Sequence, residues 1–316
     1  MSSGDADRGS ERQGSTGGSP VSRRGVLRGA AATGVAATSL TAFSGSASAG
    51  EAECLTAMDA PDGFPVVEKD EHLFGGSDWV TTNVPQGEAE VLVYVHGWLE
   101  LFAGGAADQG YTLQTALRKN GYGKPTFTYK YPTNSPNWWG QKDDAEADGR
   151  AFATWLQSYR DRNPDTTIRM VVHSLGARTG LACLDELVNV DGYDPIESFA
   201  MLGGAIHRDA ITVDGEFGDA VANGAGQVNN YYSTHDNVMA QVFTAGEFGD
   251  EGVGAYGAPD GAEVPDNYTD HDVSDVVKGH CEYYKPGDGC VPRVVENFSS
   301  GDGGDGGNDD GGWLPF

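Results

Sequence analysis

The residues best suited to do chemistry form the segment Val172-His173-Ser174-Leu175-Gly176, which directly follows the apolar residues Met170 and Val171. A serine on a sharp turn from a buried strand into a helix exposes its hydroxyl at the carboxyl edge of a sheet. The N-terminus of the following helix offers backbone N–H groups to a developing negative charge. The segment therefore predicts that Ser174 is a nucleophile. A serine that merely caps a helix is the structural alternative.

This segment resembles the nucleophile elbow of the α/β-hydrolases, in particular the His-Ser-Leu-Gly form of lipases and esterases. It departs from the Gly-x-Ser-x-Gly pattern at one position, because Val172 stands where Gly or Ala is usual. A β-branched side chain at that position has to be accommodated by its neighbours. The resemblance implies an α/β-hydrolase fold and a reaction that passes through an acyl-enzyme.

A second segment, Val95-His96-Gly97-Trp98, also ends an apolar run and precedes Ser174 by about 78 residues. It resembles the loop after the third strand of this family, which supplies a donor to the oxyanion hole. The resemblance implies that the backbone N–H groups of Trp98 and Leu175 bind the oxyanion of the tetrahedral intermediate. Gly97 would let the backbone turn inward, and we expect His96 to support the loop.

A serine nucleophile needs a general base, and the base needs a carboxylate to orient it. In this family the chain order is Ser, acid, His. That order implies Asp236, which follows an apolar run, and His280, which lies in Gly279-His280-Cys281-Glu282-Tyr283 and resembles a Gly-His-x-x-Tyr motif. Asp209 and His271 are the alternatives for the acid and the base, and either one could instead be an ordinary surface residue.

Trp138 and Trp139 belong to a segment, 131–142, that we expect to be a loop above the carboxyl edge of the sheet, where substrates bind. The two side chains could line a substrate pocket or could simply pack within the loop. No pair of histidines has i,i+4 spacing and the cysteines are scattered, so we expect no metal site. No phosphate loop or dinucleotide fingerprint is present either, and we expect no cofactor.

Alternating strands and helices are needed to position these residues, and the hydrophobic pattern predicts them. Val91–Val95 is a continuous apolar run, which is typical of a strand buried on both faces. We therefore expect an α/β fold with a mainly parallel central sheet and helices on both faces. The predicted strands are 91–95, 125–131, 167–172, 196–202, 227–233 and 267–273, and the predicted helices are 111–120, 143–162, 175–188 and 274–284.

The N-terminal residues resemble a twin-arginine export signal. Arg23-Arg24 precede an uncharged stretch of small residues, 29–49, which ends in Ala47-Ser48-Ala49. We expect residues 1–49 to be removed and the protein to be secreted, with a retained membrane anchor as the alternative. The predicted organisation continues with a lead-in segment at 50–64, a catalytic domain at 65–298 and a flexible Gly/Asp-rich tail at 299–316. Residues 246–265 are predicted to form a lid or a solvated insertion.

Export would permit disulfides. Cys281 and Cys290 flank the turn-forming run 285–289, and a bridge between them is the tentative prediction. Cys183 lies among apolar residues and is expected to be a buried free thiol. Cys54 would lie near the new N-terminus, where lipidation is the alternative to an ordinary cysteine.

The 316 residues include 47 Asp and Glu against 20 Lys and Arg, which gives a net charge of −27. This charge argues against nucleic acid as the main partner, because phosphate binding needs clustered basic residues. Acid excess with few lysines resembles the proteins of salt-loving archaea.

Together these features predict an exported, monomeric serine hydrolase that cleaves a small-molecule or lipid ester and whose other partner is the twin-arginine export machinery. A thioesterase or peptidase of the same fold, or a non-catalytic extracellular binding protein on this scaffold, are the alternatives.

Overall fold

The apolar runs of the sequence form the central strands of one sheet in the computed structural model, which describes residues 57–71, 77–98, 105–133, 135, 137–287 and 289–301. Val91–Val95 is fully buried along its whole length, as are most residues of the strand that leads to Ser174. Both faces of these strands are covered, so apolar side chains occupy consecutive positions rather than alternate ones.

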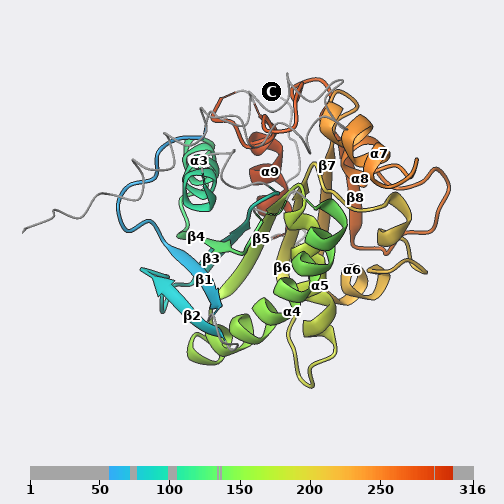
Figure 1. Ribbon diagram of the computed structural model, residues 1–316. Helices are drawn as coiled ribbons and strands as arrows, with labels where there is room; N and C mark the ends of the chain where they lie inside the picture. The colour runs from blue at the N-terminus through green and yellow to red at the C-terminus, as the bar shows by residue number, and fades with distance from the viewer. Residues whose placement is uncertain are drawn as a thin grey trace, which may run out of the picture. The chain divides into compact units, whose positions relative to one another are not determined.

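Eight strands form the sheet in the order β2-β1-β4-β3-β5-β6-β7-β8 (Figure 1). Within this sheet β2 runs antiparallel to β1, and every other neighbouring pair is parallel. The strands are β1 (Val66–Glu71), β2 (Ser77–Thr82), β3 (Glu90–Val95), β4 (Thr126–Lys130), β5 (Thr167–His173), β6 (Ile196–Leu202), β7 (Ala225–Tyr232) and β8 (Tyr268–Asp272).

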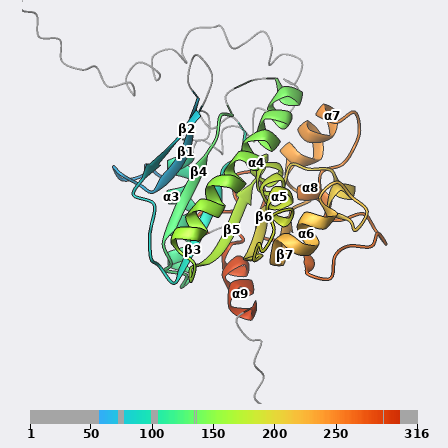
Figure 2. The same ribbon diagram turned by 90° about the horizontal axis from the view of Figure 1, so that it is seen from below.

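Helices cover both faces of the sheet, and Figures 1 and 2 show α4 and α5 on one face and α9 on the other. Along β3, Val91, Val93 and Val95 pack with α4 and α5, whereas Leu92 and Tyr94 pack with α3 and α9. The helical segments are α3 (Ala106–Lys119), α4 (Trp138–Arg162), α5 (Gly176–Val188), η3 (Arg208–Ile211), α6 (Gly218–Gly224), η4 (Val238–Phe243), α7 (Thr244–Gly246), α8 (Val253–Tyr256) and α9 (Val291–Gly301).

A mostly parallel sheet with helices on both faces, and with a strand–serine–helix turn at its carboxyl edge, is the α/β-hydrolase fold. The predicted fold class is therefore confirmed. The six predicted strands are confirmed to within two residues at each end. The two N-terminal strands β1 and β2 were not predicted, because β2 and the second half of β1 carry polar residues at most positions.

Two helices begin earlier than their patterns indicate. α3 starts at Ala106 rather than 111, and α4 starts at Trp138 rather than 143. The prediction that Trp138 and Trp139 lie in a loop is therefore wrong, since both lie in the first turn of α4. Residues 246–265 contain the short helix α8, and α9 extends three residues into the predicted tail.

The predicted helix at 274–284 is absent, and the segment consists of turns. One helical bond is present, from the N–H of Val277 to the carbonyl of Val273 at 2.8 Å, but other backbone groups of the segment bond to partners outside it. The carbonyl of Val277 accepts from the hydroxyl of Ser233 at 2.7 Å, and the carbonyl of Tyr283 accepts from the N–H of Cys290 at 2.9 Å. Hydrogen bonds to residues outside the segment thus take the place of a continuous helical series.

The predicted signal segment and most of the predicted tail lie outside the described residues. Among the helices of the part that is described, none is long and apolar enough to cross a membrane.

Candidate active site

Ser174 occupies the turn between β5 and α5 in a left-handed backbone conformation, with φ +55°. A non-glycine residue in this region costs on the order of 1–3 kcal/mol, and such strain is found at functional sites. Hydrogen bonds hold the turn in place: the N–H of Ser174 donates to the carbonyl of Leu202 at 3.1 Å, and its carbonyl accepts from Ala205 at 2.9 Å. Ser174 thus sits on a rigid, strained elbow.

Val172, the residue that departs from the family pattern, is accommodated from the helix side. A Cβ placed on Gly180, which lies one turn into α5, would be 2.8 Å from the Cγ1 of Val172 and 2.7 Å from the Cε2 of Phe199. The space that a side chain would fill at position 180 is thus taken by the larger residue at 172. Strand β5 and helix α5 can therefore stay in close contact, because the small residue is Gly180 in α5 and the larger one is Val172 in β5.

His280 links Ser174 to Asp236. Its Nε2 lies 2.8 Å from the Oγ of Ser174, and its Nδ1 lies 2.8 Å from the Oδ2 of Asp236. A carboxylate can only accept, so Nδ1 carries the proton and Nε2 is free to accept the proton of the serine hydroxyl. All three residues are buried, and Asp236 has no exposed surface. The structure therefore brings together the three residues that the sequence singled out for the triad.

Asp236 follows β7 in a turn and is held by two more donors. The N–H of Met239 donates to its Oδ1 at 3.0 Å, and the hydroxyl of Tyr283 lies 3.1 Å from its Oδ2. Burial, with the carboxylate of Asp236 close by, raises the pKa of Tyr283 well above its ordinary value, so the phenol stays a donor. Sequence reasoning noticed the Gly-His-x-x-Tyr motif but gave Tyr283 no role; that motif was the available signal.

The alternative residues lie elsewhere. Asp209 belongs to η3. His271 lies on β8, where its Nε2 is 2.8 Å from the Oδ1 of Asn229. Neither one has a hydrogen bond to Ser174 or His280 among the contacts of the described residues.

The loop that holds Trp98 packs directly against the serine. A Cβ on Gly97 would lie 2.8 Å from the Cβ of Ser174, so only glycine fits there. Within the described part of the chain, the backbone N–H groups of Trp98 and Leu175 donate to no protein acceptor. They are therefore available to an oxyanion. His96 supports the loop, because its ring stacks on Tyr131 with centroids 4.6 Å apart and the hydroxyl of Tyr131 donates to its carbonyl at 2.9 Å.

The two predicted substrate-binding tryptophans have different surroundings. The ring of Trp138 lies 5.1 Å from that of Trp98 and 5.9 Å from that of Phe243. Trp139 is half exposed and stacks on Phe248, an exposed residue. Among the described residues, the ring of Trp138 meets Trp98 of the predicted oxyanion loop, whereas the ring of Trp139 meets Phe248.

The predicted bridge between Cys281 and Cys290 is wrong. Cys281 is disulfide-bonded, whereas Cys290 and Cys183 are buried free thiols. Burial raises the pKa of the Cys290 thiol to about 12. Cys290 packs against the α9 side of the sheet, where its sulfur donates to the carbonyl of Tyr283. The partner of Cys281 and the fourth cysteine, Cys54, lie outside the described residues.

No group of three or more His, Cys, Asp or Glu side chains is placed to hold a metal ion among the residues that the structure describes. The arrangement around Ser174 can act by itself as a nucleophile with a base, an orienting carboxylate and two N–H donors.

Comparisons with known proteins give one family match and a set of solved structures with low sequence identity. A family model described as "Protein of unknown function (DUF726)" matches residues 125–294, more than half of the chain. This region contains Ser174, Asp236 and His280. No curated protein matches the sequence.

Among solved structures, an esterase from the archaeon Pyrobaculum calidifontis is 12% identical, with 89% of this chain and 99% of that chain covered and a TM-score of 0.46. A serine hydrolase without a lid from Xanthomonas campestris is 14% identical, with 77% and 95% covered and a TM-score of 0.40. A carboxylesterase from Bacillus subtilis is 12% identical, with 80% and 96% covered and a TM-score of 0.39.

Proposed function

We propose that this chain, which belongs to the family described as "Protein of unknown function (DUF726)", is an exported serine hydrolase that cleaves carboxylic ester bonds. The observation that carries the proposal is the unbroken hydrogen-bonded chain from Asp236 through His280 to Ser174. Acyl transfer by a serine needs a base that is hydrogen-bonded to the nucleophile and an acid that orients the base, and this arrangement provides both.

The geometry supports a two-step mechanism. As the Oγ of Ser174 attacks the ester carbonyl, the Nε2 of His280 takes its proton, and Asp236 stabilises the imidazolium that forms. The N–H groups of Trp98 and Leu175 bind the oxyanion. His280 then gives its proton to the leaving alcohol, and water, activated by the same histidine, releases the acid from the acyl-enzyme. Side chains, backbone and water carry every step.

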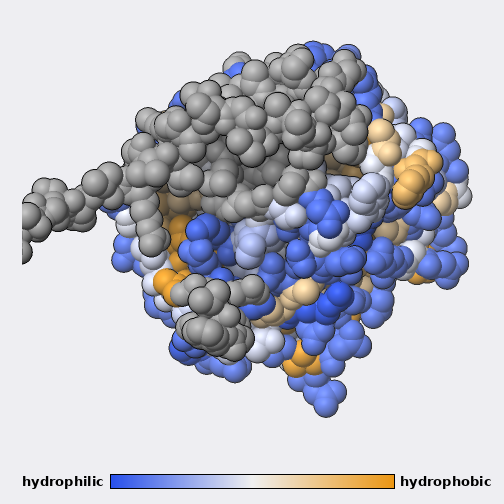
Figure 3. Space-filling view, in the orientation of Figure 1, coloured by the Kyte–Doolittle hydropathy of each residue, from blue (hydrophilic) through white to orange (hydrophobic). Residues whose placement is uncertain are grey.

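Export is supported by the cysteines as well as by the N-terminal residues. A disulfide at Cys281 persists in oxidising compartments and is rare in the cytosol. The excess of 47 Asp and Glu over 20 Lys and Arg supports a protein that works in brine, and the coloured residues of the face shown in Figure 3 are mostly hydrophilic. These observations support the proposal that the enzyme works outside the cell in concentrated salt.

The test is labelling by a fluorophosphonate, which reacts with activated serines, in high salt. Wild-type protein should be labelled once, at Ser174, and the Ser174→Ala variant should not be labelled. His280→Ala should lose most of the labelling and at least about 1,000-fold in hydrolysis of 4-nitrophenyl esters. Folded wild-type protein that takes up no probe would remove the enzymatic proposal.

Labelling alone does not distinguish esters from thioesters or peptides. Matched butyryl oxygen esters, thioesters and amides should be hydrolysed with the oxygen ester fastest in kcat/KM. A faster thioester or amide reaction would replace the ester proposal with one of these two activities.

A further inference from the structure

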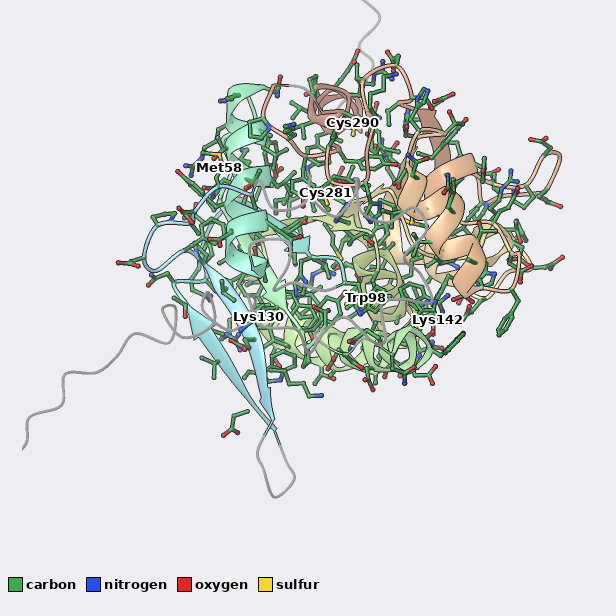
Figure 4. The ribbon with its side chains drawn as sticks, turned by 45° about the horizontal axis from the view of Figure 1, so that its top comes forward. Met58, Trp98, Lys130, Lys142, Cys281 and Cys290 are labelled. Carbon is green, nitrogen blue, oxygen red and sulfur yellow. The ribbon has the colours of Figure 1, made fainter. Side chains whose placement is uncertain are left out.

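Two indole rings lie together next to the proposed oxyanion hole. Trp98 directly follows Gly97, which packs against Ser174, and its ring meets the ring of Trp138 at 5.1 Å and 58°. Trp98 lies in the loop after β3 and Trp138 in the first turn of α4, so the pair connects two parts of the chain that are distant in sequence. Figure 4 labels Trp98 and also Lys142, which lies one turn after Trp138 in α4.

The polar end of each indole is tied down. The Nε1 of Trp98 donates to the carbonyl of Ser135 at 2.9 Å, and the Nε1 of Trp138 donates to Glu247. With their N–H groups satisfied, the remaining ring surface is apolar. Both side chains are only partly buried, so a ligand can still reach them.

Glu247 is a buried carboxylate with two basic side chains as partners. Its Oε2 lies 2.7 Å from the Nζ of Lys142 and 3.0 Å from the Nε2 of His207. Burial raises the pKa of Glu247, but hydrogen bonds from Lys142, Trp138 and His207 outweigh burial and leave the pKa below its ordinary value. A buried charge persists only where such partners compensate it. The network therefore holds the ring of Trp138 in one orientation.

Apolar side chains pack against Trp138 and connect it to the triad. Phe243 packs edge-on against Trp138, and Met239 and Ala205 belong to the same cluster. The N–H of Met239 donates to Asp236, and the N–H of Ala205 donates to the carbonyl of Ser174. The cluster is thus attached to both the nucleophile and the acid.

His280 approaches Ser174 from the other face of the sheet. Residues on both sides of it, Val277 and Tyr284, pack in the cluster with α3 and α9, whereas Trp98 and Trp138 pack in the cluster with α4 and α5. The leaving oxygen of a substrate must face His280 to receive its proton. The acyl group then takes a different direction from the leaving oxygen, and the two indoles lie on the side of the site opposite the segment that carries His280.

We infer that Trp98 and Trp138 form an apolar acyl-binding wall, held rigid by Glu247, and that the preferred substrates are esters of bulky, uncharged, apolar acids. This inference rests on the proposed function and adds the substrate class to it.

The experiment measures kcat/KM for 4-nitrophenyl acetate, butyrate and octanoate in high salt. Wild-type protein should prefer octanoate. Trp138→Ala should lower kcat/KM for octanoate about 10- to 100-fold and for acetate less than about threefold. Trp139→Ala is the matched comparison, because this neighbouring tryptophan stacks on Phe248 instead; its octanoate-to-acetate ratio should equal that of wild type.

Two further variants cover the case in which Trp138→Ala fails to fold. Trp138→Phe keeps an aromatic ring and should retain most of the octanoate preference. Glu247→Gln removes the charge that anchors the indole and should raise KM for octanoate more than it lowers kcat.

Failure of the inference is separable from failure of the proposed function. Wild-type protein that is labelled by the fluorophosphonate but prefers acetate would overturn the acyl-binding wall alone. The same holds if the Trp138 and Trp139 variants shift the octanoate-to-acetate ratio equally. Absence of labelling in folded wild-type protein would overturn the proposed function first.

Discussion

The imidazole of His173 donates from its Nε2 to the backbone carbonyl of His280 at 2.8 Å. The residue immediately before the proposed nucleophile thus holds the turn that carries the proposed base, and the two rings lie 4.7 Å apart. Burial and the neighbouring His280 lower the pKa of His173 well below its ordinary value. His173 therefore stays neutral beside a ring that becomes charged in the proposed mechanism.

Replacing His173 should lower the rate of chemistry more than substrate binding. We expect His173→Ala to reduce kcat about 10- to 100-fold with KM within about threefold, because small displacements of a base are costly. His173→Gln places an amide nitrogen near the position of Nε2 and should recover part of the loss. Steady-state kinetics on a 4-nitrophenyl ester measure both. If the Gln and Ala variants have equally low kcat, the loss of rate does not come from the missing hydrogen bond to the carbonyl of His280.

The same residue predicts a pH dependence of stability. Below about pH 6.5 the unfolded chain binds a proton at His173 that the folded chain does not, so stability falls as the pH is lowered. One group contributes at most about 1.4 kcal/mol per pH unit, until the lowered pKa of the folded state is reached. His271, whose pKa burial also lowers, acts in the same direction.

This contribution can be measured by guanidinium unfolding between pH 5 and pH 7 at fixed salt. His173→Gln should lose less stability than wild type over this interval, because it removes one of the two histidines whose pKa burial lowers. Parallel curves for the two proteins would contradict the prediction.

Gly180 should not tolerate a methyl group, and shortening Val172 should relieve part of the cost. Its added Cβ would meet Val172 and Phe199 at less than 3.0 Å. We expect Gly180→Ala to destabilise the protein by about 1–3 kcal/mol, and Val172→Ala in the same chain to restore part of this. A double-mutant cycle from denaturant midpoints measures the coupling. Additive effects of the two changes would show that Val172 does not fill the space beside Gly180.

The cysteines should react according to their burial. In a non-reducing digest the peptide with Cys281 should be recovered linked to another cysteine peptide, and we expect that peptide to contain Cys54, because Cys183 and Cys290 are free. Cys183 and Cys290 should be alkylated only after unfolding, since burial raises the pKa of both thiols. Mass spectrometry distinguishes this outcome from a bridge between Cys281 and Cys290, which would refute it.

Strands and the elbow were predictable because their signals are local. A continuous apolar run such as Val91–Val95 indicates burial on both faces from neighbouring residues alone. The strand–Ser174–helix turn likewise lies within a few residues of sequence. The first turn of α4 was missed because Trp138 precedes the amphipathic pattern that begins near residue 143, and its position depends on packing against Trp98 and Phe243.

The segment around His280 shows why local reasoning fails where tertiary contacts dominate. Its residues suggest a helix, yet the carbonyls of Val277 and His280 accept from Ser233 and His173, which are 44 and 107 positions away. The predicted pairing of Cys281 with Cys290 failed similarly. A turn-forming run between two cysteines permits a bridge, but the fold places Cys290 against the α9 face of the sheet instead.

The sequence by itself determined the fold class and identified Ser174 as the candidate nucleophile. Both signals, hydrophobic periodicity and a strand–turn–helix motif, lie in residues that are neighbours in the sequence. Chain order narrowed the acid and the base to a few candidates. Only the tertiary structure joined Asp236, His280 and Ser174 by hydrogen bonds, gave His173 and Tyr283 their positions, and assembled Trp98 and Trp138 beside the site. These relationships depend on distances between residues far apart in the chain, and such distances are set by how the strands and helices pack.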